Sequence, residues 1–156
     1  MQFYTLKDGH LASAHALDAS DRLPGGGWLS TPTEMVGFAS GVEHLLGPAW
    51  TRLMWRETSK AGDELHYALG WELGTVQGEF MTFHSGSQSG TGTFLLLVPK
   101  RKVAVAVFTN RDGADVRTVA LQMAETILGP GETKKKPAKK ATIHYAGTVK
   151  PAAGAR

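Results

Sequence analysis

Apolar residues first recur at helical spacing in the part of the chain that follows residue 30. Ser30 or Thr31 can cap a helix, Pro32 suits its first position, and Glu34 falls at the third. This pattern predicts a helix that begins near Pro32 and ends at Gly47. Its inward stripe would consist of Met35, Phe38, Ala39, Val42, Leu45 and Leu46.

Two further helices follow from similar spacing. A short one is expected over residues 48–56, with Trp50, Leu53 and Met54 inward. The other is expected over residues 114–128 and should lie across a sheet, with Gly129 as its stop. Its apolar face would consist of Val116, Val119, Ala120, Met123 and Ile127.

Strand patterns occupy the region between these helices. Residues 66–73 and 79–83 predict two strands joined by a turn at 74–78. The apolar runs 93–98 and 103–109 predict an antiparallel hairpin. Residues 1–23 show weak periodicity and predict no regular element, and their histidines, His10 and His15, have no spacing that indicates a shared site. The expected fold class is therefore α+β, an antiparallel sheet of about four strands with N-terminal helices and a C-terminal helix packed across it.

Residues 83–92 read Phe-His-Ser-Gly-Ser-Gln-Ser-Gly-Thr-Gly and separate two of the apolar runs. The stretch is longer than the two to five residues of a tight hairpin turn, which predicts a loop. It combines glycines, which let a main chain approach a ligand closely, with several polar side chains. Taken alone it is either a Ser/Gly-rich surface loop without a role or a segment that faces a ligand.

Composition and charge limit the alternatives. The chain has 156 residues, 42% hydrophobic and 20% charged, which is typical of one globular domain. The absence of cysteine excludes disulfides and thiol catalysis. No apolar run approaches the roughly 18 residues of a membrane span, and no signal peptide is visible, so the sequence indicates no compartment.

The basic residues are concentrated at the C-terminal end. Residues 133–156 contain seven of the 17 basic residues and none of the 14 acidic ones, so this segment carries +7 and the remainder −4. Such a run predicts a solvated, disordered tail over residues 132–156, after a folded domain over residues 1–131. We expect no nucleic-acid partner, because no aromatic residue alternates with these lysines to stack on bases.

Four motifs in order now carry a resemblance. They are residues 24–32 (PGGGWLSTP), residues 67–71 (YALGW), residues 84–86 (HSG), and the pair of runs from Phe94 to Asn110. Over about 110 residues the chain thus resembles the serine β-lactamase and penicillin-binding-protein superfamily, in its class C-like esterase and peptidase branch. Residues 143–149 resemble the opening of a small β-domain that often follows the catalytic domain, so the tail is either this truncated domain or a plain basic extension.

The resemblance implies acyl transfer through a serine ester. In this family three motifs share the work: a Ser-x-x-Lys helix start, a Tyr-x-Asn loop, and a Lys-Thr-Gly-like strand. His84, Ser85 and Gly86 would form the third motif, with His84 and Ser85 contacting the carbonyl or carboxylate side of the substrate. The main-chain N–H of Ser87 would supply half of the oxyanion hole, and neither a cofactor nor a metal is expected.

The other two motifs are missing from the sequence. No serine is followed three positions later by lysine, among Ser13, Ser20, Ser30, Ser40, Ser59, Ser85, Ser87 and Ser89. No tyrosine is followed two positions later by asparagine, among Tyr4, Tyr67 and Tyr145, and no Gly-x-Ser-x-Gly elbow occurs. Without a nucleophile and its base, covalent catalysis has no first step. We therefore expect a C-terminal portion of such a hydrolase that is inactive alone.

Two hypotheses on partners follow. In the parent hydrolase, the ligand would be a small-molecule or peptide acyl substrate, namely an ester, a β-lactam or a D-amino-acid peptide. The family places the strand at 103–109 beside strands that this chain lacks, which predicts self-association or a complementary N-terminal fragment. The alternative is a non-catalytic binding module that uses residues 84–92 or the basic tail.

Overall fold

The computed structural model describes residues 2–56 and 66–130. Its centre is an antiparallel sheet in the order β3-β4-β5-β6, formed by β3 (Glu72–Val76), β4 (Glu79–Gln88), β5 (Thr91–Val98) and β6 (Val103–Thr109). Consecutive strands are neighbours throughout, as in a simple meander. The predicted hairpin of β5 and β6 is confirmed, with Val98 opposite Val103 and a short 3-10 turn, η2 (Pro99–Arg101), between the strands. The α+β class with four strands is confirmed.

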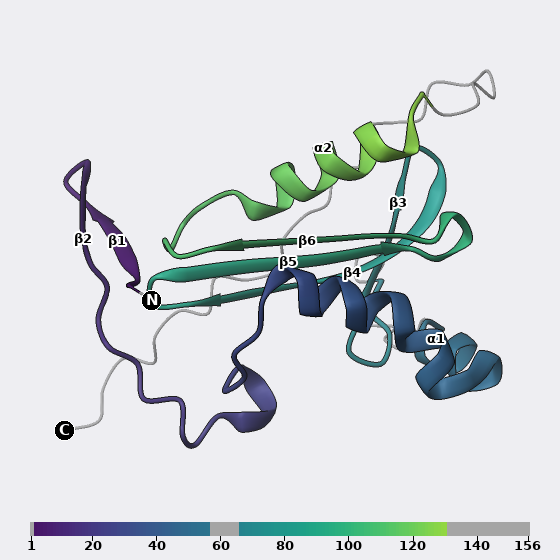
Figure 1. The fold of residues 1–156 in the computed structure, drawn as a ribbon, viewed down its shortest axis with the longest axis horizontal. Helices are drawn as coiled ribbons and strands as arrows, with labels where there is room; N and C mark the ends of the chain where they lie inside the picture. Colours follow the sequence, from purple (N-terminus) through teal and green to yellow (C-terminus); the bar gives the residue numbers. More distant parts are fainter. Residues whose placement is uncertain (1, 57–65, 131–156) are drawn as a thin grey trace.

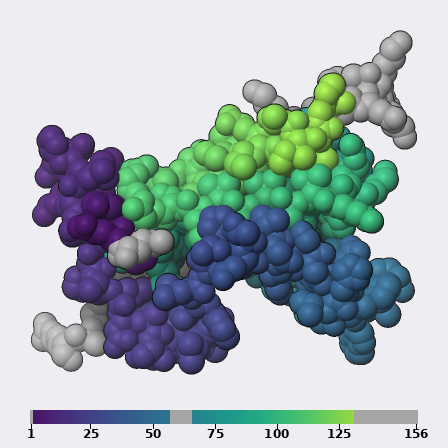
Figure 2. All heavy atoms as spheres, viewed as in Figure 1, coloured from purple at the N-terminus to yellow at the C-terminus, as the bar shows by residue number. Residues whose placement is uncertain are grey.

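One helix covers each face of this sheet, and Figures 1 and 2 show the strands lying between them. Helix α2 (Val116–Leu128) packs on the face that carries Phe83, Phe94 and Leu96, which we call the α2 face. Helix α1 (Pro32–Met54) packs on the opposite face with Leu95 and Leu97, which we call the α1 face. Each face of the sheet therefore carries a core cluster under a helix, and the predicted covering helix is confirmed.

The start of α1 agrees with the sequence pattern. Thr31 is the N-cap, its side chain accepts a hydrogen bond from the Glu34 main-chain N–H, and the Glu34 carboxylate accepts one from the Thr31 N–H at 2.8 Å. The two predicted helices over residues 32–56 are merged into one element with a break at Gly47, where φ is 74° and ψ is 163°. Gly129 ends α2 as predicted, and its N–H donates to the Glu125 carbonyl.

The predicted inward faces of the helices are wrong in part. On α1 only Ala39 and Val42 of the stripe are buried, whereas Leu45 and Trp50 are 71% and 66% exposed. Further predicted core residues that are exposed are Phe38, Leu46, Leu53, Val119, Met123 and Ile127. On α2 the buried residues are Ala120, Ala124 and Leu128. Small side chains allow a helix to approach a sheet closely, so the alanines mark the contact and the larger residues lie beside it.

The first strand pair also differs from its prediction. The predicted strand over residues 66–73 is interrupted by a bend at Leu69 and Gly70, after which β3 runs from Glu72 to Val76. The turn that follows is only Gln77 and Gly78, instead of the predicted 74–78. Tyr67 lies opposite Glu72 in an isolated bridge, so the segment before the bend runs back along the beginning of β3.

The N-terminal residues form a hairpin where none was predicted. Strands β1 (Tyr4–Lys7) and β2 (His10–Ser13) pair antiparallel around a turn at Asp8 and Gly9. Asp-Gly is a strong signal for a two-residue hairpin, and weak periodicity in the flanking strands obscured it. The hairpin lies at one end of the sheet, where the Tyr4 N–H donates to the Asn110 carbonyl at 2.8 Å (Figure 1). After this hairpin the chain makes the 3-10 turn η1 (Leu23–Gly25) and enters α1.

The boundary at residue 131 of the predicted domain 1–131 lies outside the described residues and stays a prediction. The tail over residues 132–156 lies outside the described residues, as do the β-domain motif at 143–149 and Tyr145.

Candidate functional site

Residues 83–92 form a strand, a turn and a second strand rather than a loop. Strand β4 continues to Gln88, the turn consists of Ser89 and Gly90 alone, and β5 begins at Thr91. The prediction of a loop was wrong because the serines and glycines of this stretch lack the alternating apolar pattern of a strand. Pairing with the apolar strand β5 keeps them extended, from Thr82 opposite Leu97 to Gln88 opposite Thr91.

The two edges of β4 have different partners. Strand β5 follows one edge from Thr82 to Gln88. On the other edge, β3 pairs with β4 only from Glu79 to Phe83, where its first residue, Glu72, lies opposite Phe83. Within the described part of the chain, residues 84–88 therefore have no strand on that second edge. We call this segment the open edge of β4.

The register determines which main-chain groups face the open edge. Gln88 and Thr91 flank a two-residue turn and therefore bond to each other, so the even-numbered residues of β4 direct their N–H and C=O groups to β5. Val76 and Glu79 flank another two-residue turn and also bond to each other. The odd-numbered residues of β4 therefore direct their N–H and C=O groups to the β3 side, which is the side of the open edge. The N–H groups of Ser85 and Ser87 thus point out from the open edge, and in the described ranges no hydrogen bond to either group is found.

Side chains alternate between the two faces along the same strand. His84, Gly86 and Gln88 lie on the α1 face, opposite Leu95, Thr93 and Thr91. A side chain at Gly86 would lie 2.5 Å from the Thr93 hydroxyl, so glycine keeps this face of the open edge accessible. Ser85 and Ser87 lie on the α2 face. The sequence predicted His84 and Ser85 as joint substrate contacts, whereas their side chains leave the strand on opposite faces.

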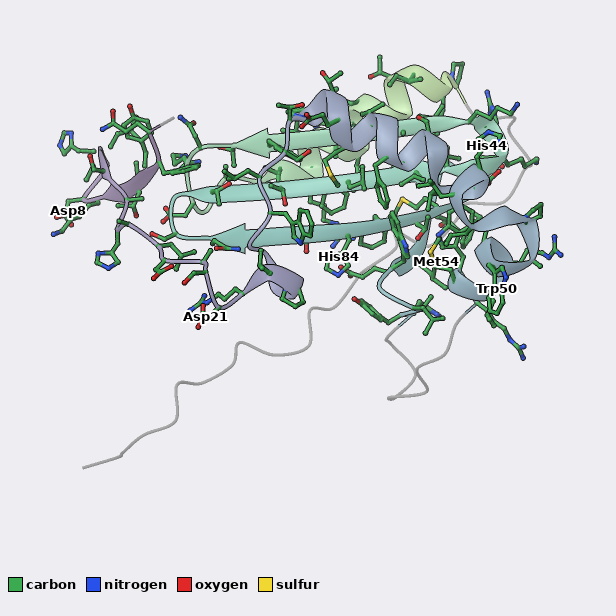
Figure 3. The ribbon with its side chains drawn as sticks, turned by 60° about the horizontal axis from the view of Figure 1, so that its bottom comes forward. Asp8, Asp21, His44, Trp50, Met54 and His84 are labelled. Carbon is green, nitrogen blue, oxygen red and sulfur yellow. The ribbon has the colours of Figure 1, made fainter. Side chains whose placement is uncertain are left out.

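His84 makes two hydrogen bonds that fix its ring. Its Nδ1 lies 2.7 Å from the Ser85 carbonyl oxygen, and its Nε2 lies 2.9 Å from the Tyr67 hydroxyl. The Tyr67 ring meets the imidazole edge-on, with the centroids 6.0 Å apart and the planes at 75°. Figure 3 shows His84 beside the sheet and Trp50 apart from it, near the C-terminal end of α1. Tyr67 belongs to the motif at residues 67–71, but the sequence alone assigns it no role.

The glycine-rich segment before α1 contacts the end of β4. The Gln88 side-chain amide donates to the Gly26 carbonyl at 2.8 Å. Gly26 has a φ of 125°, and a side chain there would collide with the Gln88 amide, so both the backbone and the contact require glycine. The Ser89 hydroxyl donates to the His15 carbonyl at 3.0 Å, which fixes the turn after β4 to the N-terminal region. These contacts were missed because their partners are far apart in the sequence.

The carboxylates whose pKa is lowered lie at the starts of helices and of a turn rather than at this site. The Thr31 main-chain N–H lowers the pKa of Glu34, and hydrogen bonds from the Thr118 side chain and main chain lower the pKa of Asp115. The pKa of Asp18 is lowered in the same way by the main-chain N–H of Ser20. Residues 2–56 and 66–130 contain no group of three His, Asp or Glu residues that could hold a metal ion.

Comparison with known proteins adds one match. The family model described as Beta-lactamase matches residues 3–128, which includes all the helices and strands above. No curated protein is significantly similar to the chain. Among the described helices, none has both the length and the apolar character to cross a membrane. The family match, the α+β fold and the order of the motifs agree, and the chain belongs to the Beta-lactamase family of serine hydrolases.

Proposed function

We propose that this chain supplies one wall of a serine-hydrolase acyl-transfer site, with the open edge of β4 against the substrate. The observation that carries the proposal is the outward-pointing N–H of Ser87, which has no hydrogen-bond partner among the described residues and lies on a strand fixed by β5. A main-chain donor on a rigid strand can be fixed at about 3 Å from an oxygen that becomes negatively charged. Ser87 would thus provide half of the oxyanion hole.

The other half and the nucleophile would come from a segment outside these 156 residues. The sequence has neither Ser-x-x-Lys nor Tyr-x-Asn, the two motifs that supply the nucleophile and its base in the resemblance described above. The chain alone would bind an acyl substrate without cleaving it. In the assembled site, the substrate would be an ester, a β-lactam or a D-amino-acid peptide.

The surface of the domain supports such a complementary segment. Strand β6 is the last strand of the sheet, so its outer edge has no strand partner within the described ranges. Trp28 and Leu29, which precede α1, are 78% and 94% exposed, and Trp50 of α1 is also exposed. An unpaired apolar strand edge and large exposed side chains are typical of surfaces that another chain covers. We propose that an N-terminal fragment carrying the missing motifs pairs with β6.

Benzylpenicillin tests the substrate-binding wall. In ¹⁵N-labelled full chain, we expect the amide signals of Ser85 and Ser87 to shift with increasing penicillin, and mass spectrometry to show no covalent adduct. Ser87→Pro, which removes the N–H, should abolish the shifts at Ser85, whereas Ser87→Ala, which keeps it, should not. Absence of shifts in the wild type, or equal binding by Ser87→Pro, would contradict the proposal.

Light scattering after size-exclusion chromatography tests the complementary partner. We expect the chain alone to self-associate, and a fragment of the same family with Ser-x-x-Lys and Tyr-x-Asn to form a 1:1 complex with it. A single stable monomer that forms no complex with the added fragment would count against pairing at β6.

The open edge also supports a second candidate function, a non-catalytic module that binds extended peptides. Such a peptide would add as a strand along residues 84–88 and bond to the N–H groups of both Ser85 and Ser87. Peptide binding without any response to benzylpenicillin would favour this alternative. The version of it that uses the basic tail concerns residues outside the described ranges.

A further inference from the structure

Tyr67 is held in a fixed position before its side chain reaches His84. Its neighbour Ala68 is buried, and the Ala68 N–H donates to the Trp71 carbonyl at 2.7 Å. The Leu69 N–H donates to the Met54 carbonyl at the end of α1, and Tyr67 itself bridges to Glu72. The main chain at Tyr67 is therefore anchored beside Glu72, the first residue of β3. From there the phenol reaches His84, the first residue of the open edge.

The two hydrogen bonds of His84 determine where the ring proton lies. The Ser85 carbonyl only accepts, so Nδ1 must carry a hydrogen. In a neutral ring Nε2 is then without a hydrogen and accepts from the Tyr67 hydroxyl. The neutral ring is thus in the Nδ1–H form, with both nitrogens engaged.

This arrangement also fixes the strand beside the proposed donor. The carbonyl that accepts from Nδ1 belongs to Ser85, and it points out from the open edge in the same direction as the Ser87 N–H. A carbonyl that is already bonded to His84 is less exposed to solvent or to a wrongly placed substrate donor. The order of contacts is therefore Tyr67 to His84, and His84 to the Ser85 carbonyl.

We infer that Tyr67 is a positioning residue for the open edge, because its hydroxyl holds His84 in the Nδ1–H form and thereby keeps the Ser85 carbonyl engaged. His84 accordingly acts on a ligand through the shape of the edge rather than as a direct donor. The inference rests on the proposed function, because it assigns Tyr67 a part in the same acyl-binding wall.

The test is a long-range ¹H–¹⁵N correlation spectrum of the imidazoles in the full chain, with His84 assigned by His84→Gln. At a pH at which the imidazole rings are neutral, we expect His84 of the wild type in the Nδ1–H form. Tyr67→Phe keeps the edge-on ring contact and removes only the hydroxyl. It should move the Nε2 signal away from its hydrogen-bonded position and increase the share of the Nε2–H form. Tyr4→Phe, at a half-buried tyrosine in β1, is the matched control and should leave His84 unchanged.

Benzylpenicillin binding gives the second readout. Tyr67→Phe should weaken the binding that is detected at Ser85 and Ser87 by about fivefold, the effect of one net hydrogen bond. An unchanged His84 spectrum in Tyr67→Phe overturns the inference while leaving the proposed function intact. A changed spectrum with unchanged affinity overturns the positioning role as well. If the wild type itself does not bind penicillin, the proposed function fails, and the spectrum alone decides whether Tyr67 holds the ring.

Discussion

The two halves of β4 differ in their surroundings although they belong to one continuous strand. From Glu79 to Phe83 the strand pairs with β3, and Thr82 and Phe83 pair with β5 as well. The side chains of Met81 and Phe83 are each only 2% exposed. From His84 to Gln88 it pairs with β5 alone, and most of its side chains are exposed or half-buried. We refer to these as the paired half and the open half.

The comparison teaches how a rigid donor can be placed at a surface. The paired half packs into the core, where the Phe83 ring stacks on Phe94 with centroids 5.4 Å apart. Since the strand is continuous, this core also fixes the direction of the open half, whose own side chains contribute little burial. A binding site on a strand is held more accurately than one on a loop.

The largest expected effect separates the halves by stability. Phe83→Ala should lower the free energy of unfolding by about 3–5 kcal/mol, because it removes a buried aromatic ring and leaves a cavity. His84→Ala, one residue later on an exposed position, should cost under about 1 kcal/mol. Urea denaturation followed by circular dichroism measures both. Equal losses would contradict the division of β4.

Proline substitutions test the alternation along the open half. His84→Pro removes an N–H that faces β5, whereas Ser87→Pro removes one that faces outward. We expect His84→Pro to destabilise the fold by about 1–3 kcal/mol more than Ser87→Pro, the cost of leaving a strand partner unbonded. Thermal unfolding of the two variants and of His84→Ala would show this. The reverse order would mean that our assignment of the outward N–H groups is wrong.

The turns at the two ends of β4 provide a smaller contrast. Gly78 and Gly90 have φ angles of 77° and 73°, so an alanine at either costs about 1–2 kcal/mol. Added at Gly90, a Cβ would also lie 2.5 Å from the Ala14 Cβ and 2.6 Å from the Phe3 Cβ, whereas at Gly78 it meets nothing within 4 Å. Gly90→Ala should therefore release the N-terminal hairpin. We expect faster amide hydrogen exchange at Tyr4 in Gly90→Ala but not in Gly78→Ala.

The smallest expected effect is a pH dependence of stability that arises outside both halves of β4, in the two helices that cover the sheet. Hydrogen bonds from Thr31 and Thr118 lower the pKa values of Glu34 and Asp115, the carboxylates at the starts of α1 and α2. A lowered folded-state pKa stabilises the fold above the ordinary value near 4, and this stabilisation is lost as the pH falls through the lowered value. Stability measured from pH 6 to pH 2 should therefore fall below about pH 4. Asp115→Asn, which still caps α2, should reduce this acid loss.

Local patterns in the sequence predicted much of this fold. The start of α1 was predictable because Thr31 and Glu34 bond to each other's main-chain N–H groups and Pro32 suits the first helical position. The β5–β6 hairpin was predictable because its two apolar runs are buried on both faces and separated by a short polar turn. Ala120 and Ala124 were harder to identify as core residues, because closeness of approach rather than side-chain size selects them.

The candidate site was predictable only as a set of residues. The motif identified His84, Ser85, Gly86 and Ser87, but the length of β4 depends on β5, and the outward direction of Ser87 depends on the register. The Tyr67–His84 contact spans 17 residues and the Gln88–Gly26 contact spans 62. No local pattern encodes such pairs, because a tyrosine hydroxyl or a glutamine amide could form an equivalent hydrogen bond with many other groups in the chain.

The contacts between the N-terminal region and the meander have a consequence for the order of folding. Strands β3 to β6 and α2 can assemble through neighbours along the chain, whereas closing Gly26 on Gln88, His15 on Ser89 and Gln2 on Asn110 spans 62, 74 and 108 residues. Contacts at such separations close large loops and form slowly. We expect the meander to form first, so that the open edge exists before the glycine-rich segment and the N-terminal hairpin dock beside it. During that interval a nascent chain would expose residues 84–88 most fully, and a complementary fragment or an extended peptide would meet the edge before the protein's own N-terminus does.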